Sequence, residues 1–355
     1  MKKLSRQLYI VLFFLLCLVP IVGMLLGFQS KAAAHEIQSR MPTSLTEDGH
    51  FRKTVLNEIS AYLDDHFAAR LELNTAWAKI NASVFRSSVD DQIVVGKNGW
   101  LYYSPTVPDF LGKSLTDEEL RAIAENLFTL QSGIEKGGSQ FIFTIAPNKN
   151  SLYGANMPSA YKDNHGQSTA ERLKPYLDEY GIHYVDLFET FSANSKTLYY
   201  ATDSHWTEEG AALAADRILT AAGKTSRFYS TGFHQEGYHL GDLYEMLFPA
   251  SKAAEAALVY DGAFSYQVHG STNNGNAMQI KTNCEDQNGR LLCWRDSFGI
   301  SLYPYLADSY EQCLFSRRTV YDLNEYPTDN YDIFILEIVE RNLASLAGDC
   351  VIVKG

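Results

Sequence analysis

The sequence predicts an α/β fold, a parallel β-sheet with helices on both faces, preceded by one N-terminal transmembrane helix. Between residues 116 and 339, short apolar strand patterns alternate with helix patterns, which is typical of this class. The segment 332–339 holds a continuous apolar run, as expected of a strand buried on both faces. The transmembrane helix is predicted from an uncharged apolar segment at residues 8–28, which is long enough to cross a hydrocarbon core of ~30 Å.

The N-terminal segment predicts a retained signal-anchor. Lys2, Lys3 and Arg6 precede the apolar run, which places the N-terminus in the cytoplasm and the rest of the chain outside. A cleaved signal peptide is the alternative, because the three alanines at 32–34 resemble a cleavage site. The apolar region of a signal peptide is usually shorter, about 7–15 residues. We therefore expect a single-pass protein of the cell membrane whose larger part is extracytoplasmic.

Three regions are expected along the chain. Residues 1–28 form the cytoplasmic tip and transmembrane signal-anchor, residues 29–90 a stalk with N-terminal helices, and residues 91–355 the catalytic domain. The stalk is polar and weakly patterned up to about residue 50, and residues 51–88 indicate one or two helices.

Local signals order the elements of the third region. Asn98-Gly99, flanked by apolar residues, predicts a β-hairpin. Thr116 and Glu119 have the spacing of a capping box, so a helix begins there and ends before Gly137. Further strands are expected at 140–146, 183–187, 290–294 and 332–339, with further helices at 171–180 and 207–222. Residues 225–285 have no clear pattern.

Composition narrows the function. The net charge is −12 and there is no basic stripe, so we expect no nucleic-acid partner. The histidines are scattered and no HExxH or CxxC motif occurs, so we expect no metal site and no cofactor. Four cysteines, Cys284, Cys293, Cys313 and Cys350, lie in the last quarter of the chain. They are compatible with two disulfides in any of three pairings, and equally with free buried thiols.

Two motifs suggest nucleophilic catalysis. Asp203 precedes His205 by two residues, just before a predicted helix, so its carboxylate can hold the imidazole Nδ1 and leave Nε2 free as a base. Ser297 follows the strand 290–294 and precedes a helix that begins near Gly299. Ligand sites lie beyond the carboxyl ends of parallel strands, and the serine N–H there can stabilise an oxyanion. The structural alternatives are a capping turn with a hydrogen-bonded histidine, and a serine N-cap.

A third motif follows the strand 140–146. Asn148 could donate a second hydrogen bond to the oxyanion, and Lys149 could orient substrate. The alternative is an ordinary polar loop between a strand and a helix.

Five segments then indicate a family. They are GKNGWLYY (96–103), APNKNSLY (146–153), YYATDSHWTEEGA (199–211), WRDSFG (294–299) and YDIFILEIVERN (331–342). In this order they resemble the AlgX/AlgJ-like and DHHW-type proteins, whose domain is related to SGNH hydrolases. The resemblance runs from about residue 50 to the C-terminus. As in that family, and unlike ordinary SGNH esterases, the Asp and His come first and the serine about ninety residues later.

The resemblance implies an SGNH-hydrolase-like, flavodoxin-like fold and an O-acetyltransferase that acts on an exopolysaccharide outside the membrane. Such proteins work with a membrane-bound O-acyltransferase (MBOAT), which supplies the acetyl group. Carried over by position, Asp203 orients His205, His205 is the general base, and Ser297 becomes acetylated. Asn148 and Lys149 match the loop beside the site, and Arg341 matches a late motif that is either functional or structural.

The sequence also departs from the family pattern. SGNH proteins usually carry Gly-Asp-Ser at the nucleophile, whereas Arg295 stands here in place of the glycine. DHHW-type sequences accept this arginine, and we count Arg295 among the expected oxyanion or substrate-binding residues. We expect polymer binding to come from the catalytic domain itself, without an appended carbohydrate-binding module. An acetylesterase with the same triad, and a non-catalytic scaffold of a polysaccharide assembly complex, remain as alternatives.

Overall fold

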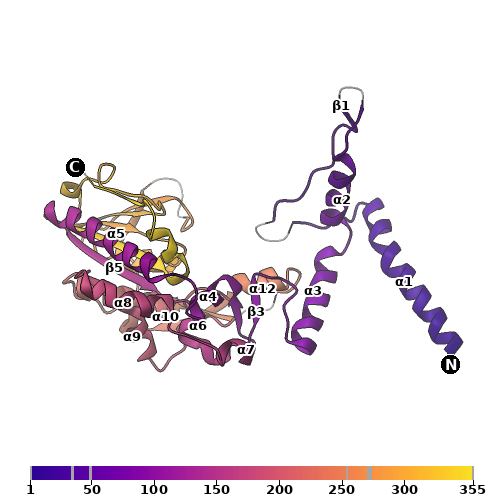
Figure 1. Ribbon diagram of the computed structural model, residues 1–355, viewed down its shortest axis with the longest axis horizontal. Helices are drawn as coiled ribbons and strands as arrows, with labels where there is room; N and C mark the ends of the chain where they lie inside the picture. The colour runs from indigo at the N-terminus through magenta and orange to yellow at the C-terminus, as the bar shows by residue number, and fades with distance from the viewer. Residues whose placement is uncertain (1, 33–35, 48–49, 253–254, 270–273, 354–355) are drawn as a thin grey trace. The chain divides into compact units, whose positions relative to one another are not determined.

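The computed structural model describes residues 2–32, 36–47, 50–252, 255–269 and 274–353 (Figure 1). The chain divides into two units. The first comprises Met1–Asp91 with Asp242–Ala253, and the second comprises Gln92–Gly241 with Ala254–Gly355. The segment Asp242–Ala253 thus clusters with the first unit although it lies far from it in sequence, and the three regions expected along the chain stay a prediction.

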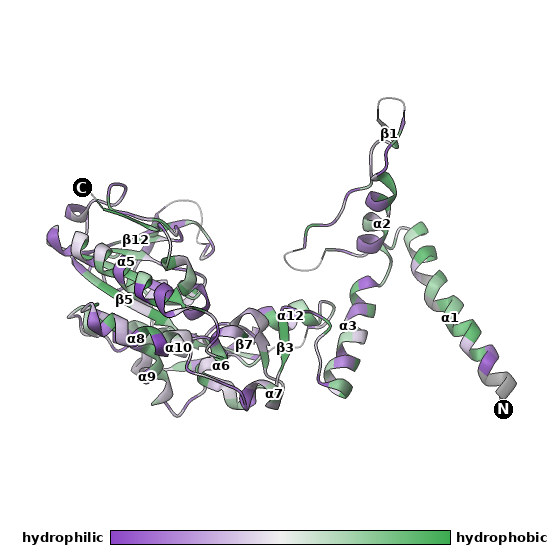
Figure 2. Cartoon of the chain, viewed as in Figure 1, coloured by the Kyte–Doolittle hydropathy of each residue, from purple (hydrophilic) through white to green (hydrophobic). Residues whose placement is uncertain are grey.

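The first unit is mainly helical. Its elements are α1 (Lys2–Leu25), β1 (Thr46–Glu47), β2 (His50–Phe51), α2 (Val55–His66), α3 (Arg70–Ile80) with a π-helical turn (Asn81–Phe85), and α12 (Asp242–Leu247). Figure 2 shows α1 as apolar along most of its length, and its segment Arg6–Leu25 is long and apolar enough to cross a membrane. A signal sequence would have the same properties, so both interpretations of the N-terminus stay open.

The second unit is built on a seven-stranded sheet. In spatial order its strands are β6 (Tyr184–Val185), β5 (Gln140–Ala146), β14 (Ile333–Val339), β11 (Arg290–Trp294), β12 (Gln312–Ser316), β10 (Gln279–Asn283) and β9 (Gln267–His269). The first five are parallel, as predicted, whereas β10 and β9 pair antiparallel at one edge. The edge strand β9 has no buried side chains and β10 alternates, so neither has the apolar run that marks the parallel strands.

Helices cover both faces of this sheet. One core layer joins it to α5 (Asp117–Lys136), α8 (Thr169–Glu179) and a 3₁₀ segment (Glu340–Leu346). The other joins it to α9 (Leu187–Ser192), α10 (Glu208–Ala221) and α13 (Gly299–Ala307). Successive residues of β14 enter opposite layers, and all seven are buried. Figure 1 shows α5 running over the sheet in front of β5.

Several boundaries follow the predicted signals. Thr116 and Glu119 form the capping box that starts α5. Asn98 and Gly99 both have positive φ, 56° and 81°, in the hairpin of β3 (Ile93–Val95) and β4 (Leu101–Tyr103). The strand expected at 183–187 is shorter, because the Asp186 carboxylate accepts a hydrogen bond from the Glu189 N–H and starts α9.

Other elements have no clear counterpart in the sequence pattern. The loop expected at 147–150 turns into α6 (Lys149–Tyr153), followed by a 3₁₀ turn (Gly154–Asn156). The region 225–285 contains, in its described part, α11 (Phe228–Thr231), α12, and the strands β7 (Phe233–His239), β8 (Glu255–Tyr260), β9 and β10. β7 pairs antiparallel with β8, and a register shift lies between Gln235 and Tyr238. All five cysteines are free thiols, and the four in the second unit are buried.

Candidate active site

Asp203 and His205 lie in a tight turn just before α10. Tyr199 and Trp206 form a β-bridge that closes this turn, and both side chains are buried. Thr207 then caps α10 by accepting the Gly210 N–H. The turn is therefore anchored at both ends by packed aromatic residues and a helix N-terminus.

Asp203, His205 and Ser297 form one hydrogen-bonded chain. The His205 Nδ1 lies 2.8 Å from Asp203 Oδ1, and the His205 Nε2 lies 2.9 Å from Ser297 Oγ. An ionised carboxylate only accepts hydrogen bonds, so Nδ1 carries the proton and Nε2 offers its lone pair to the serine hydroxyl. Asp203 is 5% exposed, which strengthens its interaction with the imidazole. This is the arrangement that a serine nucleophile and its general base require.

Ser297 lies between the end of β11 and the start of α13. The Asp296 carboxylate fixes this junction: Oδ1 accepts the Phe298 N–H at 2.9 Å, and Oδ2 accepts the Val339 N–H at 2.8 Å. The second bond joins the ends of β11 and β14. In the described part of the chain the Ser297 N–H donates to no protein group. A backbone N–H beside a helix N-terminus can stabilise an oxyanion.

A buried acid supports the same junction. The Glu337 carboxylate accepts the Asp296 N–H at 3.3 Å and is 1% exposed. Burial raises the pKa of Glu337 well above its ordinary value, and the nearby Asp296 charge raises it further. Both effects favour the protonated, neutral carboxyl group of Glu337.

The Lys149 side chain contacts the turn that carries Asp203. Its Nζ donates to the backbone carbonyls of Tyr200 at 3.2 Å, Ala201 at 3.0 Å and Asp203 at 2.5 Å. The side chain is 4% exposed and lies 5.3 Å from the centre of the Tyr102 ring. Lys149 therefore lies at the turn that carries Asp203. Its ammonium group binds backbone carbonyls of that turn and is not directed at solvent.

Asn148 belongs to a neighbouring buried network. Its Nδ2 donates to Asp109 Oδ2 at 2.9 Å, and its N–H donates to Glu340 Oε2 at 3.1 Å. Glu340 also accepts the Ser151 hydroxyl at 2.7 Å. None of the hydrogen bonds that Asn148 makes to described residues reaches Ser297, so its expected role as an oxyanion donor stays a prediction.

The two predicted arginines occupy different places. Arg295 is 4% exposed, and its Nη2 donates to the Gly275 carbonyl at 2.6 Å. Burial lowers its pKa. Arg341 is partly exposed, and its guanidinium lies 5.4 Å from the centre of the Phe298 ring, which is itself 4.8 Å from the His205 ring. Arg295 contacts the segment beside Ser297, because its Nη1 also donates to the Asp296 carbonyl at 3.2 Å, whereas Arg341 reaches the ring that packs on His205.

Both arginines line one cavity of about 450 Å³, beside the Asp296 junction. Its lining also includes Arg317, Arg318, Asn342 and Ser345. Four arginines line the cavity against the carboxyl groups of Asp296 and Glu337, and one of them, Arg318, is paired with Glu325. Positive charge therefore predominates in this cavity, in an otherwise acidic chain.

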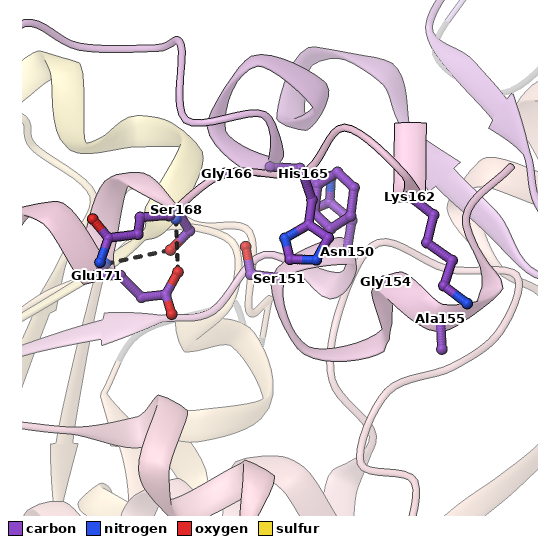
Figure 3. Close-up of a pocket in the computed structure, with 11 residues that line it drawn as sticks. Asn150, Ser151, Gly154, Ala155, Lys162, His165, Gly166, Ser168 and Glu171 are labelled. Atoms are coloured by element: carbon purple, nitrogen blue, oxygen red, sulfur yellow. Dashed lines mark hydrogen bonds between the residues drawn. The ribbon is translucent and has the colours of Figure 1, made fainter. Parts of the chain in front are cut away.

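A second cavity, of about 570 Å³, opens beside α6 (Figure 3). Figure 3 shows Asn150, Ser151, His165 and Lys162 around it, with the Ser168–Glu171 capping box at one side. Neither Asp203, His205 nor Ser297 lines this cavity. It is therefore distinct from the hydrogen-bonded chain.

The sequence did not single out three side chains that support the site. Asp296 is described above. Glu255, at the start of β8, accepts the N–H groups of Ala201 and Thr202 at 2.8 and 2.7 Å. His239, at the end of β7, places Nε2 2.8 Å from Asp203 Oδ2. Both β-strand residues lie in the region without a readable pattern, and no local motif links them to Asp203.

The α/β fold of the second unit is similar to that of SGNH-hydrolase-like proteins. Residues 93–258 match the family described as "SGNH hydrolase-like domain, acetyltransferase AlgX". Asp203 and His205 lie inside the matched segment, and Ser297 lies beyond it.

Individual proteins are similar to this chain in sequence or in fold. A probable alginate O-acetylase AlgJ of Pseudomonas syringae pv. tomato is 28% identical over 238 residues, covering 62% of this chain and 53% of that protein. The chain thus spans about half the length of this relative. A DHHW family protein from Eubacterium siraeum matches in structure with a TM-score of 0.55 and 14% identity, over 74% of this chain and 99% of that one. Bacillus cereus PatB1 with a sulfonyl adduct gives a TM-score of 0.55 and 18% identity, over 72% and 96%. The two structures support the fold, and the matches together confirm the predicted resemblance to AlgX/AlgJ-like proteins.

Proposed function

We propose that this protein is an extracytoplasmic O-acetyltransferase that transfers an acetyl group to hydroxyls of a cell-surface or secreted polysaccharide. The observation that carries the proposal is the hydrogen-bonded chain from Asp203 through His205 to Ser297, with successive distances of 2.8 and 2.9 Å. The names of the relatives, alginate O-acetylase and acetyltransferase AlgX, support acetyl transfer to a polysaccharide.

In the first half-reaction, Ser297 Oγ attacks the carbonyl carbon of the acetyl donor while its proton passes to His205 Nε2. Asp203 stabilises the imidazolium that forms. The tetrahedral intermediate carries a negative oxygen, and the Ser297 N–H, just before α13, is the proposed donor to it. The intermediate collapses to acetyl-Ser297, and the leaving group takes the proton from His205.

In the second half-reaction, a sugar hydroxyl attacks the acetyl-serine carbonyl carbon and gives its proton to His205. Collapse of the second tetrahedral intermediate returns this proton to Ser297 Oγ and releases the acetylated sugar. Water in place of the sugar would give hydrolysis, so acceptor binding decides between transferase and esterase chemistry.

The cationic cavity is the proposed subsite for the polymer. Arg341 lies next to the Phe298 ring and lines this cavity, so a polymer held there would pass close to His205 and Ser297. Guanidinium groups bind carboxylates bidentately, which suits an acidic polysaccharide.

The proposal includes a location and a partner. The apolar segment Arg6–Leu25 would anchor the chain in the membrane as a single-pass protein with the catalytic unit outside. An acetyl donor on the outer side requires a carrier across the bilayer, and a membrane-bound O-acyltransferase (MBOAT) is the proposed partner.

The test uses the full-length chain purified in detergent, with a chromogenic acetyl ester as donor. Wild type should release the chromophore and accumulate acetyl-Ser297, detected by mass spectrometry of the digested protein. Ser297→Ala should do neither, whereas Ser230→Ala, an exposed serine on α11, should behave as wild type. Adding oligosaccharides with and without carboxylates then separates transfer from hydrolysis. A folded wild-type protein that is never acetylated, even with the MBOAT partner present, would favour the scaffold alternative.

A further inference from the structure

The Asp203 carboxylate is shared by two imidazoles. Oδ1 lies 2.8 Å from His205 Nδ1 and accepts the His205 N–H at 2.8 Å. Oδ2 lies 2.8 Å from His239 Nε2. Since the carboxylate only accepts, His239 Nε2 must carry a proton and donate it. Each oxygen of this buried carboxylate is thus directed by a different histidine.

Strand pairing explains how His239 reaches this position. The register of β7 and β8 shifts between Gln235 and Tyr238, and Gly237 adopts a positive φ of 73° there. Such a bulge re-aims the side chains that follow it. After it, His239 stands directly opposite Glu255.

His239 and Glu255, which face each other across β7 and β8, contact the turn that carries Asp203 at two points. Glu255 accepts the N–H groups of Ala201 and Thr202, while His239 contacts the side chain of Asp203 in the same turn. The His239 ring also stacks on Tyr200, with ring centres 3.9 Å apart and planes 15° apart. Stacking fixes the plane of the imidazole. The ring therefore cannot rotate freely, and its Nε2–H stays directed at Asp203.

We infer that His239 is a positioning residue for the proposed acyl-transfer reaction: its Nε2–H holds Asp203 in the orientation that keeps His205 Nε2 directed at Ser297. This inference rests on the proposed function, because it acts through the same serine. The inference gives β7 a role in the site, although β7 lies outside both the motif at 199–211 and the serine segment. A histidine that only filled space beside Tyr200 would need no donor at Nε2.

Three substitutions of His239 separate the effect of the hydrogen-bond donor from that of the ring. His239→Phe keeps a flat ring against Tyr200 and removes the donor. His239→Gln removes the ring and keeps an amide N–H at the reach of Nε2. His239→Asn carries the same amide on a side chain shorter by one methylene. His234→Phe is the matched control, because His234 lies on the same strand, is exposed, and pairs with Asp261 and Glu236 instead.

The measurement is covalent labelling of Ser297 by a fluorophosphonate probe in the full-length chain in detergent, which reports serine activation without needing the natural donor. Wild type and His234→Phe should label equally. His239→Phe and His239→Asn should label roughly tenfold to hundredfold more slowly, through the maximal labelling rate rather than probe affinity, as for a lost hydrogen bond to a charged group. His239→Gln should recover most of the rate. All variants are first checked for an unchanged unfolding temperature.

Equal rates for folded His239→Phe and wild type would overturn the inference. So would a folded His239→Gln as slow as His239→Phe, since the ring and not the donor would then matter. If His239→Phe does not fold, the comparison of the Gln and Asn variants decides in the same way. Failure of the proposed function looks different, because wild type itself would then show no labelling that depends on Ser297.

Discussion

The Lys149 ammonium group lies 2.5 Å from the backbone carbonyl oxygen of Asp203, so the first residue of α6 holds the turn that carries the candidate base. Two further carbonyls of the same turn accept from this ammonium group. The segment after β5 and the segment before α10 therefore behave as one structural piece of the site.

Replacing Lys149 should damage stability and activity together. Lys149→Met keeps the length of the side chain but leaves three carbonyls without their donor. Hydrogen bonds from a charged donor contribute about 1.5–3 kcal/mol each and are not additive, so we expect a loss of about 3 kcal/mol in unfolding free energy. Denaturant unfolding and Ser297 labelling measure the two effects. An unchanged labelling rate in a folded variant would contradict the coupling of this tie to the triad. Lys113→Met, an exposed lysine, serves as control.

Asp203→Asn should abolish most of the activity without unfolding the chain. The amide can present an N–H toward His205 Nδ1, which favours the wrong tautomer and puts a proton on the Nε2 that faces Ser297. In serine hydrolases such a change costs roughly 10⁴-fold. Ester turnover and labelling should fall together. Retention of more than about a tenth of the wild-type rate would argue that Asp203 is only a capping residue.

Asp296 should matter as much for geometry as for stability. Its carboxylate joins the Phe298 N–H, the Val339 N–H and Asn342 Nδ2, the last at 3.0 Å. Asp296→Ala leaves these donors unpaired, and we expect a loss of about 2–3 kcal/mol with slower Ser297 labelling. Asp163→Ala, at an exposed position, should change neither quantity. Intact labelling in Asp296→Ala would show that the serine junction is held by other contacts.

Glu208 should make stability depend on pH near neutrality. Burial raises the pKa of Glu208 from 4.5 to about 7, although Tyr305 donates to its carboxylate. Because the folded pKa lies above the unfolded one, the related stability is fully present below pH 4.5 and is lost as the pH rises to about 7. The loss is at most about 3 kcal/mol. Thermal unfolding between pH 4.5 and 8 should show this decline in wild type and a flatter profile in Glu208→Gln. Parallel profiles would contradict the shift.

Arg341 should influence the acceptor more than the donor. Arg341→Gln removes a guanidinium from the cationic cavity, so the KM for a carboxylated oligosaccharide should rise about tenfold, with a smaller rise for a neutral one. Arg217→Gln, on an exposed face of α10, is the control. An equal change for both acceptors would indicate that Arg341 acts through Phe298 and not through the polymer.

The parts of the site that follow from the sequence are those that local chemistry specifies. The Thr116 capping box, the Asn98-Gly99 turn and the apolar run of β14 each carry their own signal, and all appear in the structure. The Asp203 and His205 pair was recognisable because both residues lie in one short motif.

The rest depends on distant contacts. β10 and β9 give weak patterns because one has alternating burial and the other no buried side chain. The Lys149 side chain was expected near substrate, but its partners lie about fifty residues away in sequence, where no local pattern could indicate them. His239 reaches Asp203 only through a strand bulge, which sequence periodicity does not reveal.

The buried cysteines have a practical consequence. Burial raises the pKa of Cys293 well above its ordinary value and that of Cys313 to about 12, so these thiols stay protonated and unreactive at neutral pH. The five cysteines are free thiols, so a reductant should leave the fold unchanged. Cys17 is the exposed thiol of the five, so it would first be replaced by serine. A cysteine engineered on an exposed loop would then react with maleimide dyes against a low background, which would show on which side of a membrane the catalytic unit lies.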